Sequence, residues 1–145
     1  MTLTPGRRFY IAGSLGLVLF ATGHTLGALH TFKLARTDTR LASALKSLDE
    51  YSISFPGLDT TLLQIRNYFE FAFSAFLLIV AALNLIALRL AGDARQSTRV
   101  MSAFNVGGMA ILLALSIYFR ILPGIVSCAT IGVLFMIAWF RARPE

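Results

Sequence analysis

The sequence predicts an all-α protein, a bundle of four transmembrane helices with one amphipathic helix in an extramembrane loop. The chain has 145 residues, of which 57% are hydrophobic and only 14% are charged. Soluble domains average about 45–50% apolar and about 25% charged residues, so this chain is too apolar for an aqueous surface. Four apolar runs are long enough to cross a bilayer, because about 20 helical residues span the ~30 Å hydrocarbon layer. We therefore expect a single four-helix membrane domain over residues 1–145.

The four membrane spans are predicted at about residues 10–28, 66–89, 100–119 and 122–140. The first follows Arg7 and Arg8, which we interpret as a topology anchor. The second and third are joined by a short polar link that contains Gly92 and Asp93. The third and fourth are joined by a tight turn at Arg120, and Pro123 suits the first turn of the last helix.

The loop between the first two spans is predicted to contain the amphipathic helix. Leu41, Leu45 and Leu48 recur at helical spacing, so this helix should lie on the membrane surface or over the mouth of the bundle. A solvated connector with a few leucines is the alternative. Phe55-Pro56-Gly57 should end the segment, and Asp59 is a candidate N-cap for the next helix.

The basic residues predict the orientation in the membrane. The net charge is +6, and its lysines and arginines are scattered over helix ends and loops instead of forming one patch with stacking aromatics. This distribution does not indicate a nucleic-acid partner. Basic residues beside helix ends favour the cytoplasmic side, so we expect a bacterial inner-membrane protein with both termini cytoplasmic. The expected cytoplasmic group is Arg7, Arg8, Arg89, Arg95, Arg99, Arg141 and Arg143, against Lys33, Arg36, Arg40, Lys46, Arg66 and Arg120 on the other side.

Two polar clusters interrupt the apolar runs and are predicted to meet in the outer leaflet. The first is Gly23-His24-Thr25-Leu26-Gly27, whose glycines form a small-xxx-small pair that lets two helices approach closely. The second is Arg66-Asn67-Tyr68-Phe69-Glu70, which opens the second span. At the helical rise of ~1.5 Å per residue, His24 and Glu70 should lie at a similar depth, and Tyr118 and Arg120 close to the same membrane face.

Glu70 is the strongest candidate for a functional residue, because a carboxylate in the apolar zone is costly and usually faces the bundle interior. The structural alternatives are a pair with Arg66 at i, i+4, or with His24 or Arg120. His24 could also simply bond to a neighbouring helix. In the functional interpretation Glu70 and His24 exchange a proton as catalytic residues. The candidate ligand-binding residues are Thr25, Arg66, Asn67, Tyr68, Tyr118 and Arg120.

Asn84 and Asn105 are predicted to form a structural pair. They should lie at similar depth in the inner leaflet, next to Gly107-Gly108, where two amides can bond across closely packed helices. Metal and cofactor sites are not expected. The chain has one cysteine, Cys128, and two histidines, and the i, i+6 spacing of His24 and His30 puts them on different faces of one helix.

Gly23-His24-Thr25-Leu26-Gly27, Arg66-Asn67-Tyr68-Phe69-Glu70-Phe71 and Tyr118-Phe119…Pro123 resemble a bacterial family of four-helix membrane proteins about 150 residues long. The resemblance covers essentially the whole chain. It implies a four-helix fold and emphasises His24, Arg66, Tyr68 and Glu70, but it implies no activity. Asn67-Tyr68-Phe69-Glu70 also fits the Asn-x-x-Glu fragment of the membrane eicosanoid and glutathione enzymes. The arginine that those enzymes carry four residues before the asparagine is here Leu63.

Two functions follow from these residues. The first is a non-enzymatic membrane protein whose outer-leaflet polar pocket binds a lipid, a quinone or isoprenoid, or a helix of a partner, within a homo-oligomer or a larger membrane complex. The second is a small isomerase- or transferase-like membrane enzyme on a lipophilic substrate. Glu70 and His24 would then supply acid–base chemistry, while Arg66 or Arg120 holds an anionic or oxygen-bearing group.

Overall fold

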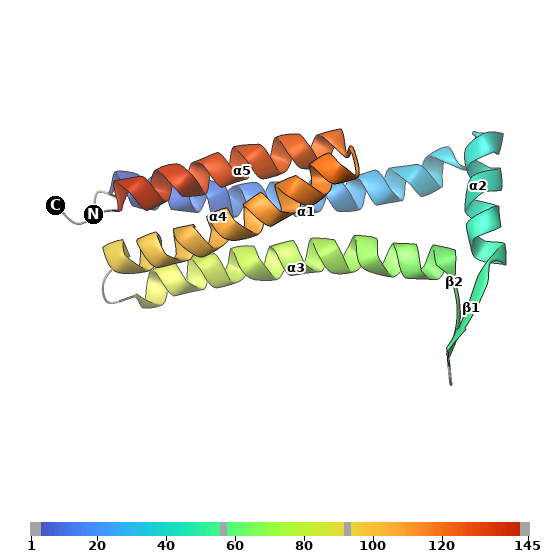
Figure 1. Cartoon of the computed structure of the whole chain (residues 1–145), viewed down its shortest axis with the longest axis horizontal. Coiled ribbons are helices and arrows are strands. Elements are labelled where there is room, and N and C mark those ends of the chain that lie inside the picture. Colours follow the sequence, from blue (N-terminus) through green and yellow to red (C-terminus); the bar gives the residue numbers. More distant parts are fainter. Residues whose placement is uncertain (1–3, 56–57, 92–93, 143–145) are drawn as a thin grey trace. The chain divides into compact units, whose positions relative to one another are not determined.

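The computed structural model describes residues 4–55, 58–91 and 94–142 and contains five helices and a two-stranded hairpin in these ranges (Figure 1). Four helices are long and apolar enough to cross a membrane, which confirms the predicted all-α class and the multi-pass membrane protein. The elements are α1 (Pro5–Leu34), α2 (Thr39–Glu50), β1 (Ser52–Phe55), β2 (Leu58–Thr61), α3 (Leu62–Leu90), α4 (Ala94–Tyr118) and α5 (Leu122–Arg141).

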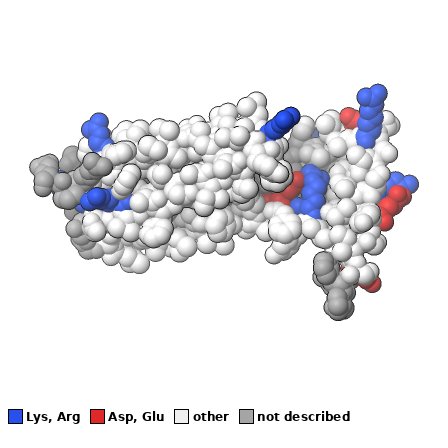
Figure 2. Space-filling view, viewed as in Figure 1, with Lys and Arg blue, Asp and Glu red and all other residues white. Residues whose placement is uncertain are grey.

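The long helices expose apolar side chains as a membrane protein does. Leu19, Leu90 and Phe104 are 73%, 81% and 75% exposed, and the visible surface of the long helices carries almost no charge over most of their length (Figure 2). A soluble protein of this size would not leave so continuous an apolar surface in water. The lipid tails of a bilayer are the natural solvent for these faces.

The chain divides into two compact units, which we describe separately. The bundle unit comprises Met1–Phe20 and Leu78–Glu145, and the loop unit comprises Ala21–Leu77. The bundle unit contains the first half of α1, the second half of α3, and all of α4 and α5. The loop unit contains the second half of α1, then α2, the hairpin and the first half of α3.

Aromatic and small residues build the core of the bundle unit. The rings of Tyr10 and Phe135 meet edge to face with centroids 5.7 Å apart, and both side chains are buried. The Tyr10 hydroxyl donates to the main-chain oxygen of Asn84 at 3.3 Å, which joins α1 to α3. The start of α1 lies beside the end of α5, where a Cβ on Gly6 would meet the backbone of Ala142 at 3.1 Å (Figure 1).

Close helix packing occurs at Gly13 and Gly16, and not at the predicted glycine pair. A Cβ on Gly13 would lie 2.9 Å from the Phe135 ring, and one on Gly16 would lie 3.0 Å from Ile131. A Cβ on Gly23 or Gly27 would meet no atom within 4 Å in the described part of the chain. The prediction that Gly23 and Gly27 bring two helices of this chain together is therefore wrong. Spacing alone does not show whether a pair of glycines faces a neighbouring helix or the outside of the protein.

The predicted asparagine pair is confirmed. Asn84 Nδ2 donates to Asn105 Oδ1 at 3.1 Å, and Asn105 Nδ2 donates to Asn84 Oδ1 at 3.0 Å, with both residues buried. Such polar bonds between membrane helices contribute ~0.6 kcal/mol on average. The neighbouring Gly107 and Gly108 do not provide a close approach between helices, since a Cβ on either has no described atom within 4 Å.

The turn between α4 and α5 follows the prediction. Arg120 has φ 57°, a left-handed conformation that is uncommon for a residue with a Cβ. Pro123 lies in the first turn of α5, where its missing N–H costs no helical hydrogen bond, as expected. Gly92 and Asp93 of the preceding link lie outside the described residues.

The amphipathic loop helix is confirmed as α2. The Asp38 side chain caps it, because Oδ1 accepts from the backbone nitrogens of Arg40 at 2.9 Å and Leu41 at 3.1 Å. Leu41, Leu45 and Leu48 are its half-buried leucines. On the exposed surface, Lys46 and Glu50 form an ion pair at 3.5 Å.

A hairpin, and not a loop ending in an Asp59 cap, leads into α3. Asp59 pairs with Ser54 in the antiparallel register of β1 and β2, so the predicted N-cap is wrong. The cap is Thr61, whose Oγ1 accepts from the Gln64 backbone nitrogen at 3.2 Å. In return, the Gln64 side chain accepts from the Thr61 nitrogen at 3.1 Å. This reciprocal capping box was readable in Thr61-x-x-Gln64. Pro56 and Gly57, the predicted breakers, lie outside the described residues.

Candidate functional site

Arg66 and Glu70 form an ion pair near the start of α3. Arg66 Nη2 donates to Glu70 Oε1 at 2.6 Å, and the two side chains are 32% and 22% exposed. The pair lies on one helix face because the residues are four apart. Arg66 follows the first residue of α3 by four positions, which places it ~6 Å along the helix from its start. The 29 residues of α3 exceed the ~20 that cross the hydrocarbon layer, so its first turns can extend into the headgroup layer of a bilayer.

Two oxygen acceptors beside this ion pair have no donor. Glu70 Oε2 and Asn67 Oδ1 are both buried and make no hydrogen bond within the described residues. Asn67 and Glu70 are three apart and therefore lie on neighbouring positions of one helix face. A buried polar atom without a partner costs about 1–3 kcal/mol. The cluster of Arg66, Asn67 and Glu70, which we call the acceptor site, thus leaves two acceptor oxygens without a hydrogen-bond donor.

The Lys46–Glu50 pair on α2 shows what an ordinary ion pair of this chain looks like. Its atoms are 3.5 Å apart and its side chains are 76% and 66% exposed, so water solvates both charges. Exposed pairs of this kind contribute about 0–1 kcal/mol. The Glu70 carboxylate, in contrast, is largely shielded from water and depends on specific partners. This difference makes Glu50 a matched control for Glu70.

Exposed aromatic side chains flank the acceptor site. Tyr68 and Phe69 are 68% and 64% exposed, and their rings meet edge to face at 5.6 Å. Tyrosine is enriched at membrane–water interfaces because its ring is apolar and its hydroxyl is polar. The predicted ligand-binding residue Tyr68 is therefore exposed on the surface of the protein near the start of α3.

His24 contacts the same face of α3 through an aromatic ring. Its imidazole meets the Phe73 ring edge to face, with centroids 5.2 Å apart. Phe73 shares the face of Arg66 and Glu70, at i+7 and i+3. Sequence reasoning missed this contact, although the helical period placed Phe73 on that face. A His24–Glu70 hydrogen bond is not among the contacts of the described residues, so proton exchange between them stays a prediction.

The remaining predicted site residues are placed as follows. Thr25 is half-buried on α1, next to His24 in the loop unit. Tyr118 and Arg120 belong to the bundle unit and are exposed, and the Tyr118 ring meets Phe119 edge to face at 5.0 Å. Their participation in the acceptor site stays a prediction. Within the described ranges, no three His, Cys, Asp or Glu side chains gather to hold a metal.

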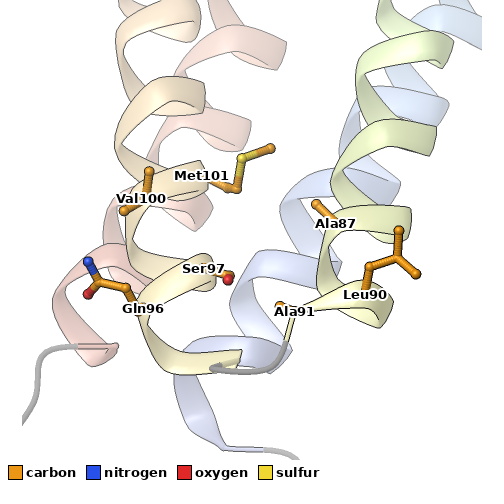
Figure 3. A pocket seen from close by; sticks show the side chains of 7 residues that line it. All are labelled: Ala87, Leu90, Ala91, Gln96, Ser97, Val100 and Met101. Carbon is orange, nitrogen blue, oxygen red and sulfur yellow. The ribbon is translucent and has the colours of Figure 1, made fainter.

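Two surface hollows lie in the bundle unit, and the residues that line them include none of the predicted site residues. The first lies between the end of α3 and the start of α4 (Figure 3). The second runs along α4. Neither includes a charged side chain, which suits lipid tails better than a polar ligand. The first is lined by Ala87, Leu90, Ala91, Gln96, Ser97, Val100 and Met101, and the second by Ala103, Phe104, Gly107, Gly108 and Ile111.

Comparison of the chain with models of protein families, with curated proteins and with solved structures gives no match. The resemblance to the four-helix bacterial family therefore stays a prediction.

Proposed function

We propose that this chain is a non-enzymatic multi-pass membrane protein that binds the polar headgroup of a lipid at the acceptor site. The observation that carries the proposal is the pair of buried oxygens without donors, Glu70 Oε2 and Asn67 Oδ1, beside the Arg66 guanidinium. A native structure normally satisfies such groups with protein, water or ligand. A headgroup with hydrogen-bond donors would complete the site.

The position of the site favours a lipid over a water-soluble ligand. It lies in the first turns of an apolar span, flanked by Tyr68 and Phe69. The loop unit also carries the amphipathic helix α2, of the kind that lies in the plane of a membrane surface. The distribution of basic residues supports an outer-leaflet site with both termini cytoplasmic in a bacterial inner membrane.

Acid–base catalysis by Glu70 and His24 has less support. Glu70 gives one oxygen to Arg66, and His24 contacts the apolar Phe73 ring. A general base must lie within hydrogen-bond reach of the proton it removes. The described contacts bring His24 to the face of α3 that bears Glu70, but they supply no proton path between the two groups.

Lipid retention tests the proposal. The protein, purified in a mild detergent and analysed by native mass spectrometry with lipid identification, should carry a bound lipid. The Glu70→Ala variant should bind this lipid about tenfold more weakly, because it loses one hydrogen bond worth ~1.4 kcal/mol. Glu70→Gln, which keeps the shape and one acceptor, should show a smaller loss of lipid affinity.

Glu50→Ala is the matched control, since it removes a glutamate from an exposed ion pair of the same spacing. This variant should retain lipid as the unaltered protein does. Equal retention in the Glu70 and Glu50 variants would contradict the proposal. A protein that holds no lipid but stays in a stable larger complex would instead favour a scaffold subunit.

A further inference from the structure

We propose that the headgroup at the acceptor site is that of a zwitterionic phospholipid with a primary ammonium group, as in phosphatidylethanolamine. This inference rests on the proposed lipid binding and specifies its chemistry. It follows from the number, charge and kind of the groups that the site leaves without partners.

The two atoms without partners are both acceptors, so the missing group is a donor. Glu70 Oε2 carries a share of the carboxylate charge, whereas Asn67 Oδ1 is a neutral amide oxygen. An ammonium group has three N–H donors and a positive charge, so it can serve both oxygens at once. Its bond to the carboxylate is charge-assisted and therefore the stronger of the two. A hydroxyl has one donor, and a quaternary ammonium has none.

The Arg66 guanidinium complements the other half of such a headgroup. It carries five N–H donors, of which Glu70 accepts from one at 2.6 Å, and its side chain is about one third exposed. Arginine binds phosphate well because its planar fork matches the phosphate oxygens. The acceptor site thus presents a cation, Arg66, and an anion, Glu70, that are joined by a hydrogen bond. A phosphate and an ammonium joined by a two-carbon linker have the complementary charges.

An anionic phospholipid without an ammonium group fits the site less well. Its phosphate could bind Arg66, but nothing in it would compensate the Glu70 carboxylate, which would repel the added negative charge. A lipid with a choline headgroup has the right charges and still cannot donate to either oxygen. The inference therefore depends on N–H donors and not on net charge, and this makes it testable with lipids of identical charge.

Stepwise N-methylation of the ethanolamine headgroup removes one N–H at a time while the charge stays constant. We would measure the affinity of the full chain for phosphatidylethanolamine and for its monomethyl, dimethyl and trimethyl forms by native mass spectrometry. The monomethyl form keeps two N–H donors and should bind like the parent, which also controls for added bulk. The dimethyl form should bind about tenfold more weakly, and the trimethyl form about a hundredfold, since each lost donor costs about 1.4 kcal/mol.

Asn67→Leu separates the two acceptors. This variant needs only one N–H, so it should bind the parent lipid about tenfold more weakly than the unaltered protein does and show no further loss for the dimethyl form. Equal affinity of the unaltered protein for all four lipids would overturn the ammonium inference and leave lipid binding standing. If neither these four lipids nor anionic phospholipids bind to the protein, the proposed function itself is overturned.

Discussion

Gly13→Leu is expected to lower the free energy of unfolding of the bundle by about 3 kcal/mol or more, the upper part of the range for overpacked cores. A Cβ at Gly13 already lies 2.9 Å from the Phe135 ring, closer than carbon atoms normally approach. Phe135 is fully buried and packs against Tyr10, so its ring cannot turn aside without disturbing a second aromatic. The rest of the leucine side chain would push α1 and α5 apart. Thermal unfolding of the detergent-solubilised protein measures the loss.

Gly23→Leu on the same helix is the matched control. It adds the same side chain where a Cβ meets no described atom within 4 Å, so the stability should change by less than about 0.5 kcal/mol. Leucine has a higher helix propensity than glycine, so equal losses in the two variants would show that the contact with Phe135 is not their cause.

Arg66→Leu is expected to destabilise the loop unit by about 2 kcal/mol. Removing the arginine leaves the Glu70 carboxylate shielded from water and without its cation, a change that costs about 3–5 kcal/mol for a fully buried pair. The remaining exposure of Glu70, 22%, reduces that value. Glu70→Leu should cost less, because the long Arg66 side chain can extend to the interface and regain water.

The double variant Arg66→Leu/Glu70→Leu distinguishes this account from a simple loss of packing. It removes both charges, so its stability should exceed that of Arg66→Leu alone. Chemical unfolding in detergent of the two single variants and the double variant gives the coupling between the two residues. Additive losses would contradict a specific ion pair at this site.

The class of fold could be predicted because it depends on composition and length. Apolar runs of about 20 residues have few other uses than crossing a membrane. The helical period of Leu41, Leu45 and Leu48 predicted α2, and the similar depth of Asn84 and Asn105 predicted their bond. The apolar runs and the leucine period are each properties of a single helix, and the asparagine pair depends only on the depths of two residues along their helices.

The packing of glycines could not be predicted, because spacing does not reveal which side of a helix faces a neighbour. Gly23 and Gly27 have the spacing of a packing motif and face open space, whereas Gly13 and Gly16 make the close contacts. The hairpin was missed because Asp59 looked like a helix cap, while the Thr61–Gln64 box marks the true start of α3.

The Arg66–Glu70 ion pair could be predicted from the sequence, whereas the two oxygens without donors beside it could not. The i, i+4 spacing of Arg66 and Glu70 allowed the ion pair. Whether the second carboxylate oxygen finds a donor depends on side chains from other elements, which the sequence does not position. The acceptors left over at Glu70 and Asn67 emerge only from the folded structure.

Covalent capture of the headgroup by Glu70 tests the central claim most directly. A carbodiimide joins a carboxylate to a primary amine that touches it, forming an amide with the loss of the elements of water. In membranes that contain phosphatidylethanolamine, the peptide that carries Glu70 should gain the mass of one such lipid less that of one water molecule, and the peptide that carries Glu50 should not. Two results would contradict a headgroup at this site. In the first, Glu70 reacts with the carbodiimide but no lipid becomes attached. In the second, lipid becomes attached equally at Glu70 and at Glu50.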